Sequence, residues 1–190
     1  MSSGPIIGND GTIFVTDVLA GTVQSVSPNG DLFWTANLGG RSSLAAKMAD
    51  GTILVATSAV VQFVGSDPVV LAPARLWALN LANGVPLWNS ILSSHPDARG
   101  DSQVVVANNA VYALLRPVIS SARCNGLTPC ETIPVLFSVS NAGVLNWSVQ
   151  SVGAIGIAKG SGNRIYAVLD DAILIPGGTD GLFRLYTFGN

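Results

Sequence analysis

Hydrophobic and polar positions alternate in short runs, and most of these runs begin just after a turn-forming pair of residues. The clearest copies are residues 10–16 (Asp-Gly-Thr-Ile-Phe-Val-Thr) and 50–56 (Asp-Gly-Thr-Ile-Leu-Val-Ala), with weaker copies at 108–114 and 162–168. Asp-Gly and Asn-containing pairs favour tight turns, and β-branched or aromatic residues favour strands. Each copy therefore predicts a turn followed by a strand.

A second pattern follows each copy of the first. A strand-like run meets an Asn/Gly turn, and a short run carrying one tryptophan comes after it, in residues 23–34, 76–88 and 136–147. A fourth copy begins at 182 and extends to the last residue, 190. Together with an apolar run before each first turn, such as 44–48, every unit predicts four antiparallel strands, which is typical of a propeller blade.

The fold expected from this repeat is an all-β propeller of four-stranded antiparallel blades. No capped amphipathic helix of ten or more residues is visible. A β-sandwich is the alternative all-β fold, and it explains the short strands but not their recurring order. The repeat predicts about three and a half to four blades. We expect them to be a fragment of a ring of about seven or eight blades; a closed ring of four blades with a defective seam is the alternative.

The four blades are expected at residues 4–40, 41–95, 96–150 and 151–190 of a single partial propeller. The last blade is predicted to lack its outermost strand, because the chain ends where the fourth tryptophan is expected. An open apolar edge of this kind favours pairing with another chain. We therefore expect a protein partner or self-association.

One copy of the second pattern resembles a known family. Residues 78–88 (Ala-Leu-Asn-Leu-Ala-Asn-Gly-Val-Pro-Leu-Trp) are similar to the tryptophan-docking motif of the pyrroloquinoline-quinone-dehydrogenase-like propellers, the quinoprotein alcohol dehydrogenase-like group. Asn80 stands where that motif has Asp, and Asn83 where it has Thr. The first and third copies are one residue shorter, as in the quinone-free members that use the propeller as a scaffold.

This resemblance implies structural roles before it implies an activity. By it, Trp34, Trp88 and Trp147 dock against neighbouring blades; the alternative is that they form base- or sugar-stacking platforms. The function that we expect is a non-enzymatic binding or scaffold propeller with no cofactor, no catalytic residues and no metal. The alternative is a fragment of a quinone-dependent alcohol or sugar dehydrogenase holding pyrroloquinoline quinone and calcium, although no Glu/Asn/Asp set for them is recognisable.

The composition of the chain excludes some classes of binding partner. Charged residues make up 11% of the chain and the net charge is −2, and there is no run of Lys or Arg, so nucleic acid and anionic membrane surfaces are not expected. No apolar run approaches the roughly 18 residues of a membrane helix. Residues 1–5 show no signal-peptide pattern.

The two cysteines, Cys124 and Cys130, are six positions apart around an Asn-Gly pair and a proline. Turn residues of these types can bring the two thiols together, so we expect a disulfide; two free thiols are the alternative. A disulfide implies an oxidising compartment. The expected location is therefore extracytoplasmic or secreted.

All extra sequence falls between the second and third strands of the units, at residues 58–74, 116–134 and 170–181. The first unit has only a short connection, 17–21, at this place. These connections emerge at one end of the blades, so this end is predicted to be the binding face, with neutral variation of exposed loops as the alternative. Aromatic residues in strand-like runs are expected in the core: Phe63, Tyr112 and Tyr166.

Two lysines, Lys47 and Lys159, each stand four residues before the turn position of their unit, on the strand expected to line the central channel. They are candidate contacts for an anionic ligand, with Arg41 nearby in sequence. Solvated lysines are the alternative, and the equivalent residues Ile7 and Val105 are apolar. Other isolated candidates are expected to be incidental: His95, Asp170, Asp171 and the Asn146-Trp147-Ser148 sequon.

Overall fold

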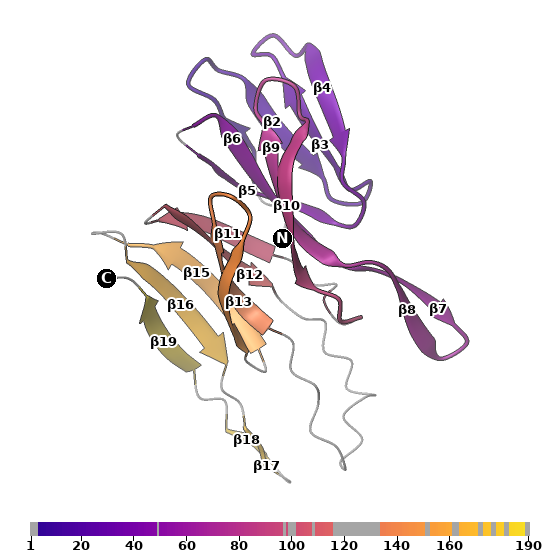
Figure 1. The fold of residues 1–190 in the computed structure, drawn as a ribbon, viewed down its shortest axis with the longest axis vertical. Coiled ribbons are helices and arrows are strands. Elements are labelled where there is room, and N and C mark those ends of the chain that lie inside the picture. Colours follow the sequence, from indigo (N-terminus) through magenta and orange to yellow (C-terminus); the bar gives the residue numbers. More distant parts are fainter. Residues whose placement is uncertain are drawn as a thin grey trace.

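A computed structural model gives the fold. It describes residues 4–48, 50–96, 98, 102–107, 109–115, 134–150, 153–160, 164–170, 173–175, 178–180 and 183–188. Every regular element in these ranges is a β-strand (Figure 1). They contain no helix long and apolar enough to cross a membrane.

The first sheet contains four strands in chain order. They are β1 (Ile6–Ile7), β2 (Ile13–Asp17), β3 (Thr22–Val26) and β4 (Leu32–Asn37), and each pairs antiparallel with the next. The sheet is thus a meander, with β1 innermost and β4 outermost.

The second sheet follows the same plan with an insertion. Its strands are β5 (Ser42–Lys47), β6 (Thr52–Thr57), β9 (Ala74–Asn80) and β10 (Pro86–Ser93). Between β6 and β9 the chain forms a separate hairpin of β7 (Val60–Val64) and β8 (Asp67–Ala72). Within the described part of the chain these two strands pair only with each other.

The third and fourth sheets complete the series. The third contains β11 (Ser102–Ala107), β12 (Ala110–Leu115), β13 (Pro134–Ser140) and β14 (Leu145–Gln150). The fourth contains β15 (Gly153–Lys159), β16 (Ile165–Asp170) and β19 (Phe183–Phe188), with a second inserted hairpin of β17 (Ile173–Ile175) and β18 (Gly178–Asp180) between β16 and β19.

The Asp-Gly-Thr turns behave as their residues predict. The Asp10 carboxylate accepts a hydrogen bond from the Thr12 backbone N–H at 3.1 Å, and Asp50 does the same for Thr52. The glycine between them has φ of +82° in both turns, a conformation that glycine adopts without steric cost. The shared sequence therefore produces the same turn twice.

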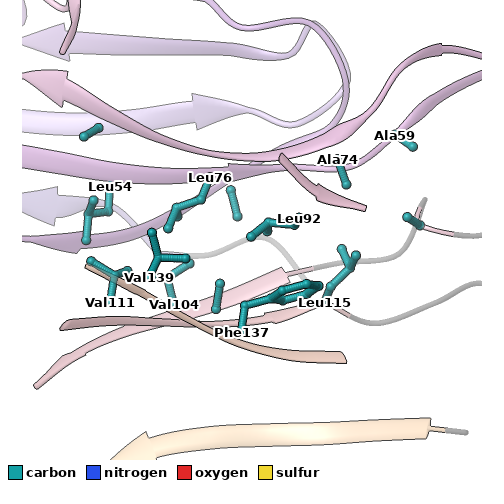
Figure 2. Close-up of a cluster of buried hydrophobic side chains, with 14 residues drawn as sticks. Leu54, Ala59, Ala74, Leu76, Leu92, Val104, Val111, Leu115, Phe137 and Val139 are labelled. Atoms are coloured by element: carbon teal, nitrogen blue, oxygen red, sulfur yellow. The ribbon is translucent and has the colours of Figure 1, made fainter. Parts of the chain in front are cut away.

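Hydrophobic clusters join each sheet to the next. Phe14 and Val23 of the first sheet pack with Ile53, Val55 and Leu79 of the second. Larger clusters join the second sheet to the third, and the third to the fourth. Figure 2 shows the cluster between the second and third sheets, in which Leu54, Leu76 and Leu92 face Val104, Val111, Leu115, Phe137 and Val139.

The innermost strands of successive sheets also lie side by side, since β11 contacts both β5 and β15. Three four-stranded meanders and a fourth sheet with three described strands pack in succession, with their first strands gathered inside, which is the architecture of a β-propeller. The predicted all-β fold class is confirmed.

Candidate binding face

One end of the blades carries the inserted segments. The strands β6 and β16 lead directly into the hairpins β7–β8 and β17–β18, which extend beyond the sheets in Figure 1. The first sheet has only a tight turn there, because Asp17 at the end of β2 accepts hydrogen bonds from the N–H groups of Leu19 and Ala20 at 3.0 Å. We call this end the loop face. Residues 116–133, which also connect a second strand to a third, lie outside the described residues.

The hairpin β7–β8, hereafter the arm, is the largest described insertion on the loop face. Phe63, near its tip, is 51% exposed, so the expectation that Phe63 belongs to the core is wrong. The alternating run was correctly assigned to a strand, but that strand leaves the blade, and within the described residues it pairs only with β8. Tyr112 on β12 is buried as expected, and Tyr166 is half-buried.

Backbone hydrogen bonds fix the base of the arm. Ser58 donates its N–H to the Arg41 carbonyl at 3.0 Å and accepts the Arg41 N–H on its hydroxyl at 3.2 Å. The next residue, Ala59, donates its N–H to the Ala98 carbonyl at 2.7 Å. Arg41 lies in the connection that enters the second sheet, and Ala98 in the one that leaves it. The base of the arm is therefore hydrogen-bonded to the connection that enters its own blade and to the one that leaves it.

The two faces of the arm have different surroundings. Val61 and Val70 pack against the cluster between the second and third sheets. The opposite face, which we call the outer face of the arm, is exposed and contains two polar and three apolar residues: Gln62, Asp67, Val64, Val69 and Leu71. The exposed fractions are 62% for Val64 and 60% for Leu71. The arm therefore presents apolar side chains to solvent.

Beside the base of the arm lies a polar cluster that the sequence did not single out. The Arg75 guanidinium lies 5.8 Å from the centre of the Trp77 ring and donates a hydrogen bond to the Asn89 side-chain carbonyl. The Trp77 indole N–H donates to the buried Thr57 hydroxyl at 3.1 Å. Trp77 was the signal in the sequence that could have indicated this cluster, because it is the one tryptophan outside the repeated position.

Two tryptophans of the repeat, Trp34 and Trp88, contact the next sheet. Trp34 on β4 donates its indole N–H to the Leu81 carbonyl at 3.1 Å, and its ring lies against Gly84 in the β9–β10 turn. Trp88 on β10 lies against Gly143 in the β13–β14 turn in the same way. The ring centres of Trp147 and Tyr112, both in the third sheet, are 6.0 Å apart. Gly189, which matches Gly84 and Gly143 in the repeat, lies outside the described residues. What these contacts contribute to stability stays a prediction.

The two channel lysines have equivalent backbone positions. Lys47 pairs with Ile53, and Lys159 pairs with Ile165. The strand β11 lies between theirs, and its residue at the matching position is Val106, which pairs with Val111. The expected equivalent, Val105, was wrong by one position, because the β11–β12 turn is one residue shorter than the turn after Lys47.

The three predicted cations, Lys47, Lys159 and Arg41, do not lie together at one end of the strands. Arg41 immediately precedes β5 while Lys47 ends it, so an extended strand of about 20 Å separates them. The Lys159 side chain is exposed, and the Lys47 side chain lies outside the described residues. Anion binding by Lys47 and Lys159 stays a prediction.

The remaining candidates are scattered. His95 lies in the β10–β11 connection, and Asn146 is exposed on β14, where it donates a hydrogen bond to the Ser138 hydroxyl. Cys124, Cys130 and Asp171 lie outside the described residues, as does the side chain of Asp170. Among the side chains that are described, no three His, Cys, Asp or Glu residues cluster as metal ligands do.

Comparison with known proteins supports the fold. The chain is similar to the crystal structure of BamB from Moraxella catarrhalis, a β-propeller protein, with a TM-score of 0.52 and 12% identity over 98% of this chain and 46% of that one. It is also similar to a protein of unknown function from Bacteroides caccae, with a TM-score of 0.49 and 18% identity over 77% of this chain and 48% of that one.

The chain thus spans about half the length of the solved structures that it matches. No protein-family model matches the sequence, and neither does any curated protein. At 12% identity the likeness to BamB shows the propeller fold alone.

Proposed function

We propose that this propeller is a non-enzymatic binding scaffold that presents its loop face to a protein partner. The observation that supports the proposal best is the outer face of the arm, where Val64 and Leu71 remain exposed although the base of the arm is fixed by hydrogen bonds. Exposed, contiguous apolar surface on a fixed element is typical of interaction sites.

The chemistry of the arm favours a protein over other partners. Its strands have free edges within the described residues, so the backbone can pair with another extended chain. Its only charged residue is Asp67, at the tip. Nucleic acids and anionic membrane surfaces require a basic surface, which this segment lacks.

The proposal includes an extracytoplasmic location and no cofactor. The location depends on the predicted Cys124–Cys130 disulfide. The absence of a cofactor is tested against the alternative, a quinone-dependent dehydrogenase fragment. The purified chain is incubated with pyrroloquinoline quinone and calcium, and its absorbance and dye-linked alcohol oxidation are measured. Oxidation that depends on both additions would support the dehydrogenase instead.

Site-specific photo-crosslinking in the source cells tests the role of the loop face. A benzophenone amino acid replaces Phe63 on the arm in one protein and Phe33 in the control. Phe33 is 60% exposed on β4, next to the β3–β4 turn at the end of the blades opposite the loop face. The two positions thus match in residue type and exposure.

The expected result is one discrete protein adduct from position 63 that is absent from position 33. Mass spectrometry of the adduct identifies the partner, or identifies a second copy of this chain. Equal labelling from both positions, or no adduct from position 63, would contradict the proposed binding face.

A further inference from the structure

Arg75 is a cation held in one place by groups other than a carboxylate of the described residues. Its contacts are the Trp77 ring and the Asn89 amide, and it forms no ion pair with any carboxylate of the described residues. In a chain with 11% charged residues, an arginine that is positioned but not neutralised is an unusual feature. A guanidinium has five N–H donors, and the Asn89 amide uses one of them.

The surroundings of Arg75 fix its guanidinium in advance. Trp77 is half-buried against the cluster between the first and second sheets, and its N–H is held by Thr57, which is 2% exposed. A guanidinium on an aromatic face gains cation–π energy and loses little freedom when it binds a planar anion. The site is therefore preorganised for a ligand that takes a bidentate pair of hydrogen bonds.

The outer face of the arm continues into this site. Thr57 pairs with Arg75, and Arg75 with Ile91, so the arm leaves the blade at the register of the arginine. Val69 and Leu71 are two positions apart and Arg75 is four further on, so all three stand on the side of β8 and β9 that faces away from the third sheet. Ile91, opposite Arg75, is also exposed.

The first sheet leaves this surface open at the loop face. Its β2–β3 turn is short, and no insertion from that sheet extends beside the arm. The apolar residues of the outer face, Val64, Val69 and Leu71, thus lead toward the fixed Arg75 guanidinium at the base of the arm.

We propose that this surface binds an extended apolar polypeptide segment whose carboxylate pairs with Arg75. This inference depends on the proposed function and specifies the chemistry of its partner. A carboxylate fits because it carries one charge and two oxygens, which match one guanidinium. Nucleic acid binding instead depends on a series of cations along the surface, whereas the described residues here include only Arg75 and, at the base of the arm, Arg41.

The charges also set the direction of the bound segment. From β7 through β9, Asp67 at the tip of the arm and Arg75 at its base are the two charged residues. The carboxylate therefore lies at the base, and a neutral or basic residue lies at the tip. From Val69 to Arg75 an extended chain covers about 20 Å, which a partner segment of about six residues matches.

Hexapeptides with alternating Val, Leu or Phe and Ser supply the probes. Each carries an N-terminal fluorophore and is made in three forms: with a free C-terminal carboxylate, with a C-terminal amide, and with a C-terminal amide and a penultimate Glu. The three forms distinguish a chain terminus from an acidic side chain as the source of the carboxylate. Binding to the full chain is measured by fluorescence anisotropy.

Matched variants locate the binding. Arg75→Gln removes the charge, while Arg164→Gln removes that of an exposed arginine beside the β15–β16 turn, at the opposite end of the blades. Leu71→Ser is paired with Val144→Ser, which has a similar exposed fraction of 61% in the third sheet. Urea midpoints verify that every variant is folded.

The expected result is that one or both carboxylate forms bind and that the plain amide binds about tenfold more weakly. Arg75→Gln is expected to weaken carboxylate binding about tenfold and to leave amide binding unchanged, while Arg164→Gln changes neither by more than about twofold. Leu71→Ser is expected to weaken all forms, and Val144→Ser none.

Three outcomes would overturn the inference: no binding by any form, equal binding of the amide, or equal effects of Arg75→Gln and Arg164→Gln. If the Phe63 crosslink still forms in the cells, these outcomes reject the carboxylate site and leave the proposed function standing. If the crosslink also fails, both are rejected.

Discussion

The indole N–H of Trp34 in the first sheet donates a hydrogen bond to the carbonyl of Leu81 in the second, 47 residues later, at 3.1 Å. The same ring covers Gly84, so one side chain joins two sheets through a polar and an apolar contact. Trp88 and Gly143 repeat the apolar contact between the second and third sheets. The first and second blades therefore each attach to the next through the outermost strand as well as through the core.

Gly84→Ala is expected to destabilise the protein by more than backbone strain alone. Gly84 has φ of +70°, and a Cβ there would lie 2.4 Å from Cε3 of Trp34. The positive φ costs an alanine about 1 kcal/mol. Displacing the indole and its hydrogen bond adds about 1–3 kcal/mol. Urea unfolding of the two proteins measures the difference.

Gly30→Ala is the matched control. Gly30 occupies the same position in the β3–β4 turn with φ of +96°, but a Cβ there would meet no heavy atom within 4 Å. Gly30→Ala is expected to lower the free energy of unfolding by about 1 kcal/mol, which is the cost of the positive φ alone. Equal losses at the two glycines would show that the Trp34 contact contributes nothing.

Trp88→Ala is expected to lower the free energy of unfolding by about 3 kcal/mol, within the range for removing a buried aromatic side chain. Trp88 packs against the cluster between the second and third sheets and against Gly143. Phe33→Ala on the exposed surface of β4 is the control, with an expected change within about 0.5 kcal/mol. An unchanged urea midpoint for Trp88→Ala would instead favour an exposed stacking platform.

The Cys124–Cys130 disulfide is expected in protein from an oxidising host. Closing so short a loop stabilises the folded state by about 2 kcal/mol in the chain-entropy model. Intact mass with and without reductant, followed by alkylation, tests the bond. Two alkylated thiols in unreduced protein would contradict it and would remove the support for an extracytoplasmic location.

The repeated parts of the fold followed from the sequence because their interactions are local. Asp10 and Asp50 each bind an N–H two residues later, so a short motif is sufficient to predict the turn. The spacing from that turn to the tryptophan then fixes the strand order. Trp34 and Gly84 belong to adjacent copies of one motif, and the family resemblance indicated that Trp34 docks against the neighbouring blade but not which residue it contacts.

The arm and the Arg75 cluster could not be predicted from the sequence, because neither belongs to the repeat. Phe63 lies in an alternating apolar run, and such a run looks the same in a covered strand as in an exposed one. Arg75, Trp77 and Asn89 come together through cross-strand pairing of β9 with β10. That pairing was predictable, but which face of the sheet remains open depends on the short turn of the neighbouring blade.

Gln103 is expected to hold the third and fourth sheets together at their innermost strands. Its side-chain carbonyl on β11 accepts the Ile157 N–H of β15 at 3.1 Å, next to a register irregularity between Ala154 and Gly156. Gln103→Leu keeps an extended apolar stem but removes the acceptor, so this N–H loses its protein partner. We expect a loss of about 1 kcal/mol in stability and faster hydrogen exchange at the Ile157 amide. Gln62→Leu on the exposed arm is the control for side-chain chemistry, and it should leave that amide unchanged. Exchange at Ile157 that is equally slow in wild type and Gln103→Leu would show that the bond does not hold β15 against β11.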